Sequence, residues 1–174
     1  LFFLCLSGFV IPFVVMYNLR ITLCNKRIFS GIYSNTKKRV KVGKHRLLVV
    51  DDQDGIVSFL YDFFSRKDYD VLQATNGKSA IQLVRKENPD IVLLDIKLGW
   101  GINGLEVLKQ IKDLSPRTRV IMMTSVSDED VIKRAFDLGA DDYVIKPFSL
   151  HYLEKVVMLK VLSMEIENIG EKEQ

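Results

Sequence analysis

The sequence predicts an α/β domain in which five helices cover both faces of a doubly wound, five-stranded parallel sheet. Two observations predict this class. Short apolar runs recur between residues 46 and 165, and they are continuous rather than alternating, as is typical of strands buried on both faces of a parallel sheet. Stretches with helical periodicity separate these runs, and right-handed crossovers would place the helices on both faces of the sheet.

The five predicted strands are short runs of mostly aliphatic residues. Four strong runs cover residues 47–50, 91–94, 120–123 and 143–145. A weaker run at residues 71–74 lies between the first two and includes the polar Gln73. Together these runs supply the strands of the sheet.

The five predicted helices carry apolar residues at spacings of three and four, as amphipathic helices do. These positions are Ile56, Leu60, Phe63 and Phe64, then Ala80, Leu83 and Val84, then Leu105, Leu108 and Ile111, then Val131, Ala135 and Leu138, and finally Leu153, Val156, Val157 and Val161. Ser149 is expected to cap the start of the fifth helix, and Gly139 is expected to follow the end of the fourth.

Polar side chains follow four of the predicted strands at the point where each strand ends. They are Asp51 and Asp52, then Asp95, then Thr124, then Lys146. In a doubly wound sheet, ligands gather beyond the carboxyl ends of the strands. Each residue alone could be a helix cap or a surface residue, but their joint occurrence at four strand ends favours a functional site.

The chemistry of these residues points to phosphoryl transfer with a bound metal ion. Three carboxylates repel one another, and a divalent cation with a preference for oxygen ligands, such as Mg²⁺, relieves that repulsion. Lys146 adds a positive charge, and Thr124 adds a hydroxyl that can donate to a phosphoryl oxygen. One carboxylate would then attack phosphorus and form an acyl phosphate.

Four stretches of the chain resemble the response-regulator receiver domains of two-component signalling systems, over roughly residues 46–165. They are LVVDD at 48–52, DIVLLD at 90–95, MTS at 123–125 and GADDYVIKPF at 139–148. In this order and spacing the four stretches are highly specific for the family. The resemblance implies a flavodoxin-like sheet with strand order 2-1-3-4-5.

The resemblance also implies roles for the residues of the metal site. Asp95 would be the phosphoacceptor and would take its phosphoryl group from a histidine kinase or a phosphotransfer protein. Asp51 and Asp52 would hold Mg²⁺ together with Asp95, with Asp52 the more direct ligand of the acidic pair. The backbone carbonyl of Lys97 would supply a further ligand.

The same resemblance implies a switch. Thr124 would move toward the phosphoryl group, Tyr143 would change rotamer with it, and Lys146 would pair with the phosphate, its bond to Pro147 being cis. The surface of the fourth helix, fifth strand and fifth helix would then bind or release a downstream protein. The chain would thus be a signalling module that catalyses its own phosphorylation and dephosphorylation, rather than an enzyme.

One segment departs from the family pattern. The loop Gly99–Gly104 is longer and richer in glycine than usual, so that Asn103-Gly104 arrives one residue late; Trp100 is expected on the loop surface. This keeps open an alternative, a pseudo-receiver that only binds proteins. A phosphohydrolase would need a second Asp where Lys97 stands, and a dinucleotide-binding enzyme would need a glycine-rich turn after the first strand.

The ends of the chain differ from its middle. Residues 1–46 hold nine basic and no acidic residues, so the remainder of the chain, residues 47–174, holds 16 basic and all 22 acidic residues, a formal net charge of −6. An acidic domain gives no reason to expect direct binding to nucleic acid. Both cysteines, Cys5 and Cys24, precede the domain, which is compatible with a cytoplasmic location.

Residues 1–19 form an apolar leader, and residues 20–45 form a basic linker. The leader is read as a fragment or over-extended reading frame, as a membrane anchor that keeps the domain at the inner face, or as a cleaved signal peptide, although no basic segment precedes the apolar run. Residues 166–174 are read as a polar C-terminal tail. Apolar positions near this end would suit a homodimer helix, a linker to a further domain or a solvated end; they are Leu159, Leu162, Ile166 and Ile169.

Overall fold

The computed structural model describes residues 44–99, 101–125 and 127–172, and for Glu171 and Lys172 only the backbone. The leader at 1–19, the linker up to residue 43 and the position of Trp100 lie outside these residues. The described elements are β1 (Arg46–Val50), α2 (Asp54–Ser65), β2 (Asp70–Ala74), α3 (Gly77–Glu87), β3 (Ile91–Asp95), α4 (Gly104–Leu114), β4 (Arg119–Thr124), α5 (Glu129–Asp137), β5 (Asp142–Ile145) and α6 (Leu150–Lys172).

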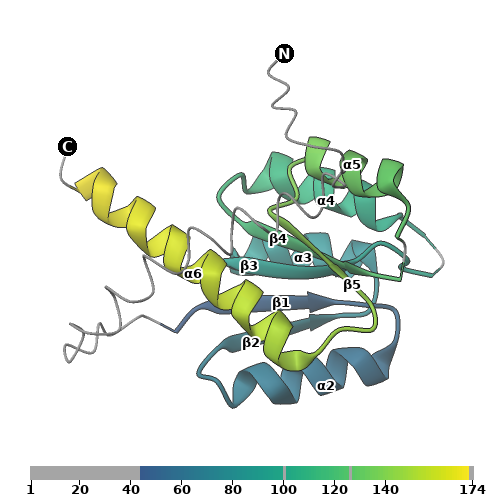
Figure 1. The fold of residues 1–174 in the computed structure, drawn as a ribbon, viewed down its shortest axis with the longest axis horizontal. Coiled ribbons are helices and arrows are strands. Elements are labelled where there is room, and N and C mark those ends of the chain that lie inside the picture. The colour runs from purple at the N-terminus through teal and green to yellow at the C-terminus, as the bar shows by residue number, and fades with distance from the viewer. Residues whose placement is uncertain (1–43, 100, 126, 173–174) are drawn as a thin grey trace, which may run out of the picture. The chain divides into compact units, whose positions relative to one another are not determined.

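The five strands form one parallel sheet in the order β2-β1-β3-β4-β5 (Figure 1). This confirms the predicted fold class and strand order. The chain passes from β1 outward to β2 and then returns across β1 to β3, so the winding direction reverses between β1 and β3. In sheets of this kind the crevice outside the carboxyl ends of such strands is where ligands bind.

Helices α2 and α6 cover one face of the sheet, and α3, α4 and α5 cover the other (Figure 1). Successive residues of a strand point to opposite faces, so Leu47 and Val49 pack with the α2 and α6 side chains, whereas Leu48 and Val50 pack with the other three helices. Both faces are therefore buried, which is why the strand sequences are continuously apolar.

The predicted helix ends are confirmed. The Ser149 hydroxyl accepts a hydrogen bond from the backbone N–H of Tyr152, at 3.1 Å, at the start of α6. Gly139 follows α5 with a φ of +95°, and its N–H donates to the carbonyl of Phe136. Side chains of Asn76, Asn103 and Asp128 cap α3, α4 and α5.

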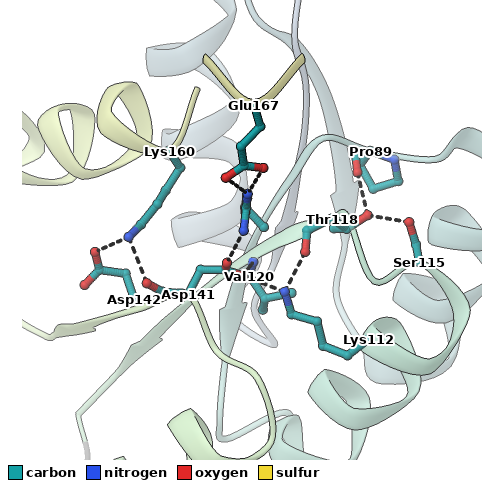
Figure 2. A network of polar contacts seen from close by, with 10 residues as sticks. Pro89, Lys112, Ser115, Thr118, Val120, Asp141, Asp142, Lys160 and Glu167 are labelled. Carbon is teal, nitrogen blue, oxygen red and sulfur yellow. Dashed lines mark hydrogen bonds and ion pairs between the residues drawn. The ribbon is translucent and has the colours of Figure 1, made fainter. Parts of the chain in front are cut away.

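A polar network holds the amino-terminal edge of the sheet, opposite the strand ends of the predicted site (Figure 2). The Asp141 carboxylate accepts hydrogen bonds from Lys112 Nζ at 2.6 Å, Arg119 Nη1 at 3.0 Å and the Val120 N–H at 2.8 Å. Lys160 Nζ on α6 donates to the backbone carbonyl of Asp141 at 2.8 Å. The network ties α4, β4, β5 and α6 together.

Helix α6 is 23 residues long and passes residue 165 without a break. Its later turns are tied to the sheet by Glu167, which pairs with Arg119 of β4, while Glu165 Oε1 lies 3.2 Å from Nε2 of His45, the residue before β1. Among the described residues, no helix combines the length and the apolar character needed to cross a membrane.

Candidate functional site

The strand ends bring three of the predicted site residues together at the carboxyl edge of the sheet. Val50 of β1 lies beside Leu94 of β3 in the parallel register, so Asp51 and Asp95 follow at neighbouring positions. Lys146 follows β5 and reaches both carboxylates from the far side of β4. The Lys146–Pro147 peptide bond is cis, as the resemblance implies.

Lys146 bridges the two carboxylates. Its Nζ lies 2.5 Å from Asp51 Oδ2 and 2.8 Å from Asp95 Oδ2. All three side chains are largely shielded from water, with exposed fractions of 16% for Lys146, 0% for Asp51 and 6% for Asp95. Ion pairs this shielded are screened little by solvent, so they govern the charge state of the site.

Asp52 completes an acidic cluster with Asp51 and Asp95. One carboxylate oxygen from each residue lies within 4.8 Å of the others, and Asp52 is exposed to solvent. The acidic pair does not serve as the side-chain cap of α2, because Gln53 occupies the N-cap position and the backbone N–H that donates to Asp51, at 3.0 Å, is that of Gln53. Three oxygen donors of this kind fit a hard divalent cation such as Mg²⁺.

The cluster holds three carboxylates, and the single ammonium group of Lys146 pairs with two of them. Burial raises the pKa of Asp51, although Lys146 and the Gln53 N–H oppose that shift. Burial alone would lower the pKa of Lys146, but hydrogen bonds and charge from Asp51 and Asp95 outweigh it and raise the pKa. Lys146 is therefore protonated at neutral pH, and a second cation would favour full ionisation of the cluster.

Thr124 and Tyr143 lie on the strands next to the cluster. Thr124 ends β4, its side chain is fully buried, and its carbonyl accepts the Lys146 N–H at 2.8 Å. Burial, together with the negative charges of Asp95 and Asp128, raises the pKa of Tyr143 to about 12. Tyr143 on β5 therefore lies within electrostatic range of Asp95.

The loop between β3 and α4 contacts the site in two ways. The N–H of Lys97 donates to Asp95 Oδ1 at 3.3 Å, while the Lys97 side chain is exposed. At the far end of the loop, the Gly104 N–H donates to the carbonyl of Ile96 at 2.9 Å. The loop is thus closed at its base directly beside Asp95.

Gly104 is a residue whose importance the sequence reasoning missed. A Cβ atom on Gly104 would lie 2.2 Å from the carbonyl oxygen of Asp95 and 2.6 Å from the Cα of Ile96, so no side chain fits. The signal was visible, because Asn103-Gly104 stands out as an Asn-Gly pair, but sequence alone did not place it against the backbone of Asp95.

An open pocket of about 570 Å³ lies beside the loop, between the loop and the first turns of α5. Leu98, Gly99 and Asn103 line it from the loop, and Asp128 and Val131 line it from α5. The pocket adjoins the acidic cluster through Gly99, because a Cβ atom built on Gly99 would lie 3.1 Å from Asp52 Oδ2.

Fold and site together define a class of protein: doubly wound α/β domains that gather carboxylates and one lysine at the carboxyl edge of a parallel sheet. The sequence profile of the response regulator receiver domain matches residues 47–158. The chain belongs to this family, as its motifs predict.

Comparison with curated proteins gives the same result. The sporulation initiation phosphotransferase F of Bacillus subtilis is 40% identical over 112 residues, which span 64% of this chain and 90% of the relative. Three regulatory proteins among the relatives are longer, and this chain spans 27% to 47% of their length. The chain is thus a signalling module homologous to the receivers of phosphorelay response regulators, and these relatives support phosphorelay signalling over a binding-only pseudo-receiver.

Comparison with solved structures also finds receiver domains and response regulators. The CheY-like receiver domain protein of Methanospirillum hungatei JF-1 is 26% identical, with a TM-score of 0.70, and the match covers 72% of this chain and 99% of that one. A response regulator of Burkholderia pseudomallei, solved with a phosphorylated aspartic acid, a calcium ion and citrate, is 26% identical with a TM-score of 0.63; the match covers 74% of this chain and 75% of that one.

Proposed function

We propose that this receiver takes a phosphoryl group onto Asp95 from a histidine kinase or a phosphotransfer protein, with Mg²⁺ bound. The observation that carries the proposal is the bridge of Lys146 Nζ to Asp51 and Asp95 within a cluster of three carboxylates. The Burkholderia regulator, which carries a phosphorylated aspartic acid and a calcium ion, supports it.

Asp51, Asp52 and Asp95 would hold the Mg²⁺, with the backbone carbonyl of Lys97 as a further ligand. The three carboxylate oxygen donors support this assignment, because oxygen ligands suit a hard cation. When bound, Mg²⁺ supplies positive charge that offsets the repulsion among the carboxylates and the incoming phosphoryl group.

In the proposed reaction, a carboxylate oxygen of Asp95 attacks the phosphorus of a phosphohistidine. The new O–P bond forms as the P–N bond breaks, and the electron pair of that bond returns to the histidine nitrogen. Lys146 shifts its hydrogen bond from the Asp95 carboxylate to an oxygen of the bound phosphoryl group, so its positive charge stays beside the growing negative charge. The same residues would support hydrolysis of the acyl phosphate by the receiver itself.

The proposed output is a change in the surface made by α5, β5 and α6. Thr124 would turn its hydroxyl to a phosphoryl oxygen, and Tyr143 would follow. Apolar side chains are exposed on these three elements, among them Phe136, Ile145 and Tyr152, with exposed fractions of 41% to 46%. They would bind or release a downstream protein, or a second copy of the chain in a homodimer.

We further propose the domain division at residues 46–165, with a cytoplasmic location for the receiver. If residues 1–19 belong to the native protein, they would anchor it to the inner face of a membrane. These proposals rest on the composition of the sequence and on the family.

The decisive experiment is intact-mass spectrometry of the full chain after incubation with Mg²⁺ and acetyl phosphate. We expect a mass gain of one phosphoryl group, which disappears in Asp95→Asn and in the presence of EDTA. Lack of any gain, both with acetyl phosphate and with a phosphorylated histidine kinase, would contradict the proposal. Binding of beryllofluoride, which mimics a phosphoryl group without transfer, would then identify a receiver that has kept the site and lost the reaction.

A further inference from the structure

The longer loop between β3 and α4 meets the acidic cluster at a single residue, Gly99. The φ angle of Gly99 is +59°, in the left-handed region. A Cβ atom built on Gly99 would lie 3.1 Å from Asp52 Oδ2 and 3.7 Å from Asp52 Cβ. The loop backbone therefore packs directly against the exposed carboxylate of the cluster.

We propose that Gly99 is a positioning residue for the metal site. Because it has no side chain, the longer loop can lie against Asp52 without displacing its carboxylate from Asp51 and Asp95. This inference rests on the proposed binding of Mg²⁺ by these three carboxylates. It explains how the chain accommodates a loop that departs from the family pattern beside its most sensitive residues.

A side chain on residue 99 would move Asp52 rather than the loop. Leu98 is 96% buried in the core on the side of the sheet covered by α3, α4 and α5, and the Gly104 N–H closes the loop base on the carbonyl of Ile96, so the loop is held on both sides of the contact. Asp51 and Asp95 are held by Lys146, whereas Asp52 is exposed. The carboxylate of Asp52 is thus the group that yields.

The size of the displacement is small, but the metal is sensitive to it. A contact of 3.1 Å is shorter than an ordinary separation of a carbon and an oxygen atom, so the carboxylate must move by a few tenths of an ångström. Mg²⁺ demands near-ideal octahedral geometry at short ligand distances. The shift should therefore weaken metal binding more than it weakens folding.

The chain offers a matched control for this idea. Gly101 lies in the same loop with a φ of +132°, farther from the left-handed well than Gly99, so Gly101→Ala carries at least as much backbone strain, but a Cβ there meets no atom within 4 Å. Gly99→Asn is a second test variant, because Asn tolerates left-handed φ angles better than Ala and still carries the Cβ. Comparing the three variants separates backbone strain from contact with Asp52.

The test is isothermal titration of Mg²⁺ into the metal-free full chain and into each variant. We expect Gly99→Ala and Gly99→Asn to weaken Mg²⁺ binding by about tenfold, the lower end of the range for groups that orient metal ligands, and Gly101→Ala to stay within about twofold. Urea unfolding in EDTA shows that each variant folds.

Two results would overturn this inference and leave the proposed metal site intact. They are wild-type Mg²⁺ affinity in both Gly99 variants, or a loss of Mg²⁺ affinity in Gly101→Ala as large as theirs. Wild-type protein that binds no Mg²⁺ would overturn both this inference and the proposed metal site. The two failures are distinguishable, because the wild-type titration is read independently of the variants.

Discussion

At the scale of single residues, Lys146 determines the charge balance of the site. It is the ammonium that faces both Asp51 and Asp95, and neither carboxylate has much contact with water. Removing one partner of a buried ion pair costs more than the pair contributes, because the remaining charge is left without water or a counterion.

Replacement of Lys146 by Met should therefore destabilise the metal-free protein. We expect the free energy of unfolding in EDTA to fall by about 3 kcal/mol, and Mg²⁺ to restore part of the loss by neutralising the same carboxylates. Urea unfolding with EDTA and with Mg²⁺ measures both. Lys133→Met, on the exposed side of α5, is the matched control and should change stability by less than about 0.5 kcal/mol. A Lys146→Met protein as stable as wild type in EDTA would contradict this reasoning.

Among the glycines that the structure describes, Gly104 is the one at which an added Cβ would make the shortest contact. Because a Cβ there would overlap the backbone of Asp95 and Ile96, Gly104→Ala must push the loop away from β3. We expect a loss of about 2 kcal/mol or more, measured by urea unfolding. Gly55→Ala on α2 meets no neighbour and should be neutral or stabilising by up to about 1 kcal/mol. Equal effects of the two substitutions would show that the close approach at Gly104 is unimportant.

At the scale of elements, Asp141 links the helices to the amino-terminal edge of the sheet. It accepts three hydrogen bonds and is 14% exposed, whereas Glu167, at the far end of the same network, is 59% exposed. The contacts of Asp141 in this network (Figure 2) are therefore better shielded from water than those of Glu167, and we expect them to contribute more to stability.

Asp141→Ala should cost about 3 kcal/mol, because it leaves Lys112 and Arg119 without their shielded partner. Glu167→Ala should cost less than about 1 kcal/mol, as an exposed ion pair does. Thermal or urea unfolding of the two variants compares them directly. The interpretation fails if Glu167→Ala proves the more damaging substitution.

The elements themselves were largely predictable from the sequence. Short continuous aliphatic runs such as 91–94 are typical of strands buried on both faces, and Ser149 and Gly139 mark helix ends by their intrinsic chemistry. The polar network was not predictable, because Asp141 appears in the sequence only as part of a motif. Its partners Lys112 and Arg119 come from segments that the fold alone brings together.

At the scale of the whole molecule, metal binding and folding are linked. A ligand that binds only the folded state stabilises it by an amount set by the ratio of ligand concentration to Kd. The acidic cluster forms only when β1 and β3 pair, so Mg²⁺ should bind the folded chain alone.

At a Mg²⁺ concentration ten times the Kd, we expect the free energy of unfolding to rise by about 1.4 kcal/mol. Asp52→Ala should remove most of this gain while leaving the metal-free stability nearly unchanged, because Asp52 is exposed. Asp62→Ala, an exposed acid on α2 outside the cluster, should keep the full gain. Chemical unfolding at several Mg²⁺ concentrations tests this, and an equal gain in Asp52→Ala would exclude that residue from the metal site.

The sheet, its helices and the kinds of side chain at the strand ends could all be predicted from the sequence, because local periodicity and the chemistry of Asp, Thr and Lys depend only on residue type and spacing. Three features of the site became visible only in the folded chain: which oxygen of Asp95 faces Lys146, the burial of Asp51 beside the exposed Asp52, and the contacts of Gly99 and Gly104 with the site. These features depend on contacts between strands and loops far apart in the chain. They exist only once β1, β3 and β5 are aligned in one sheet.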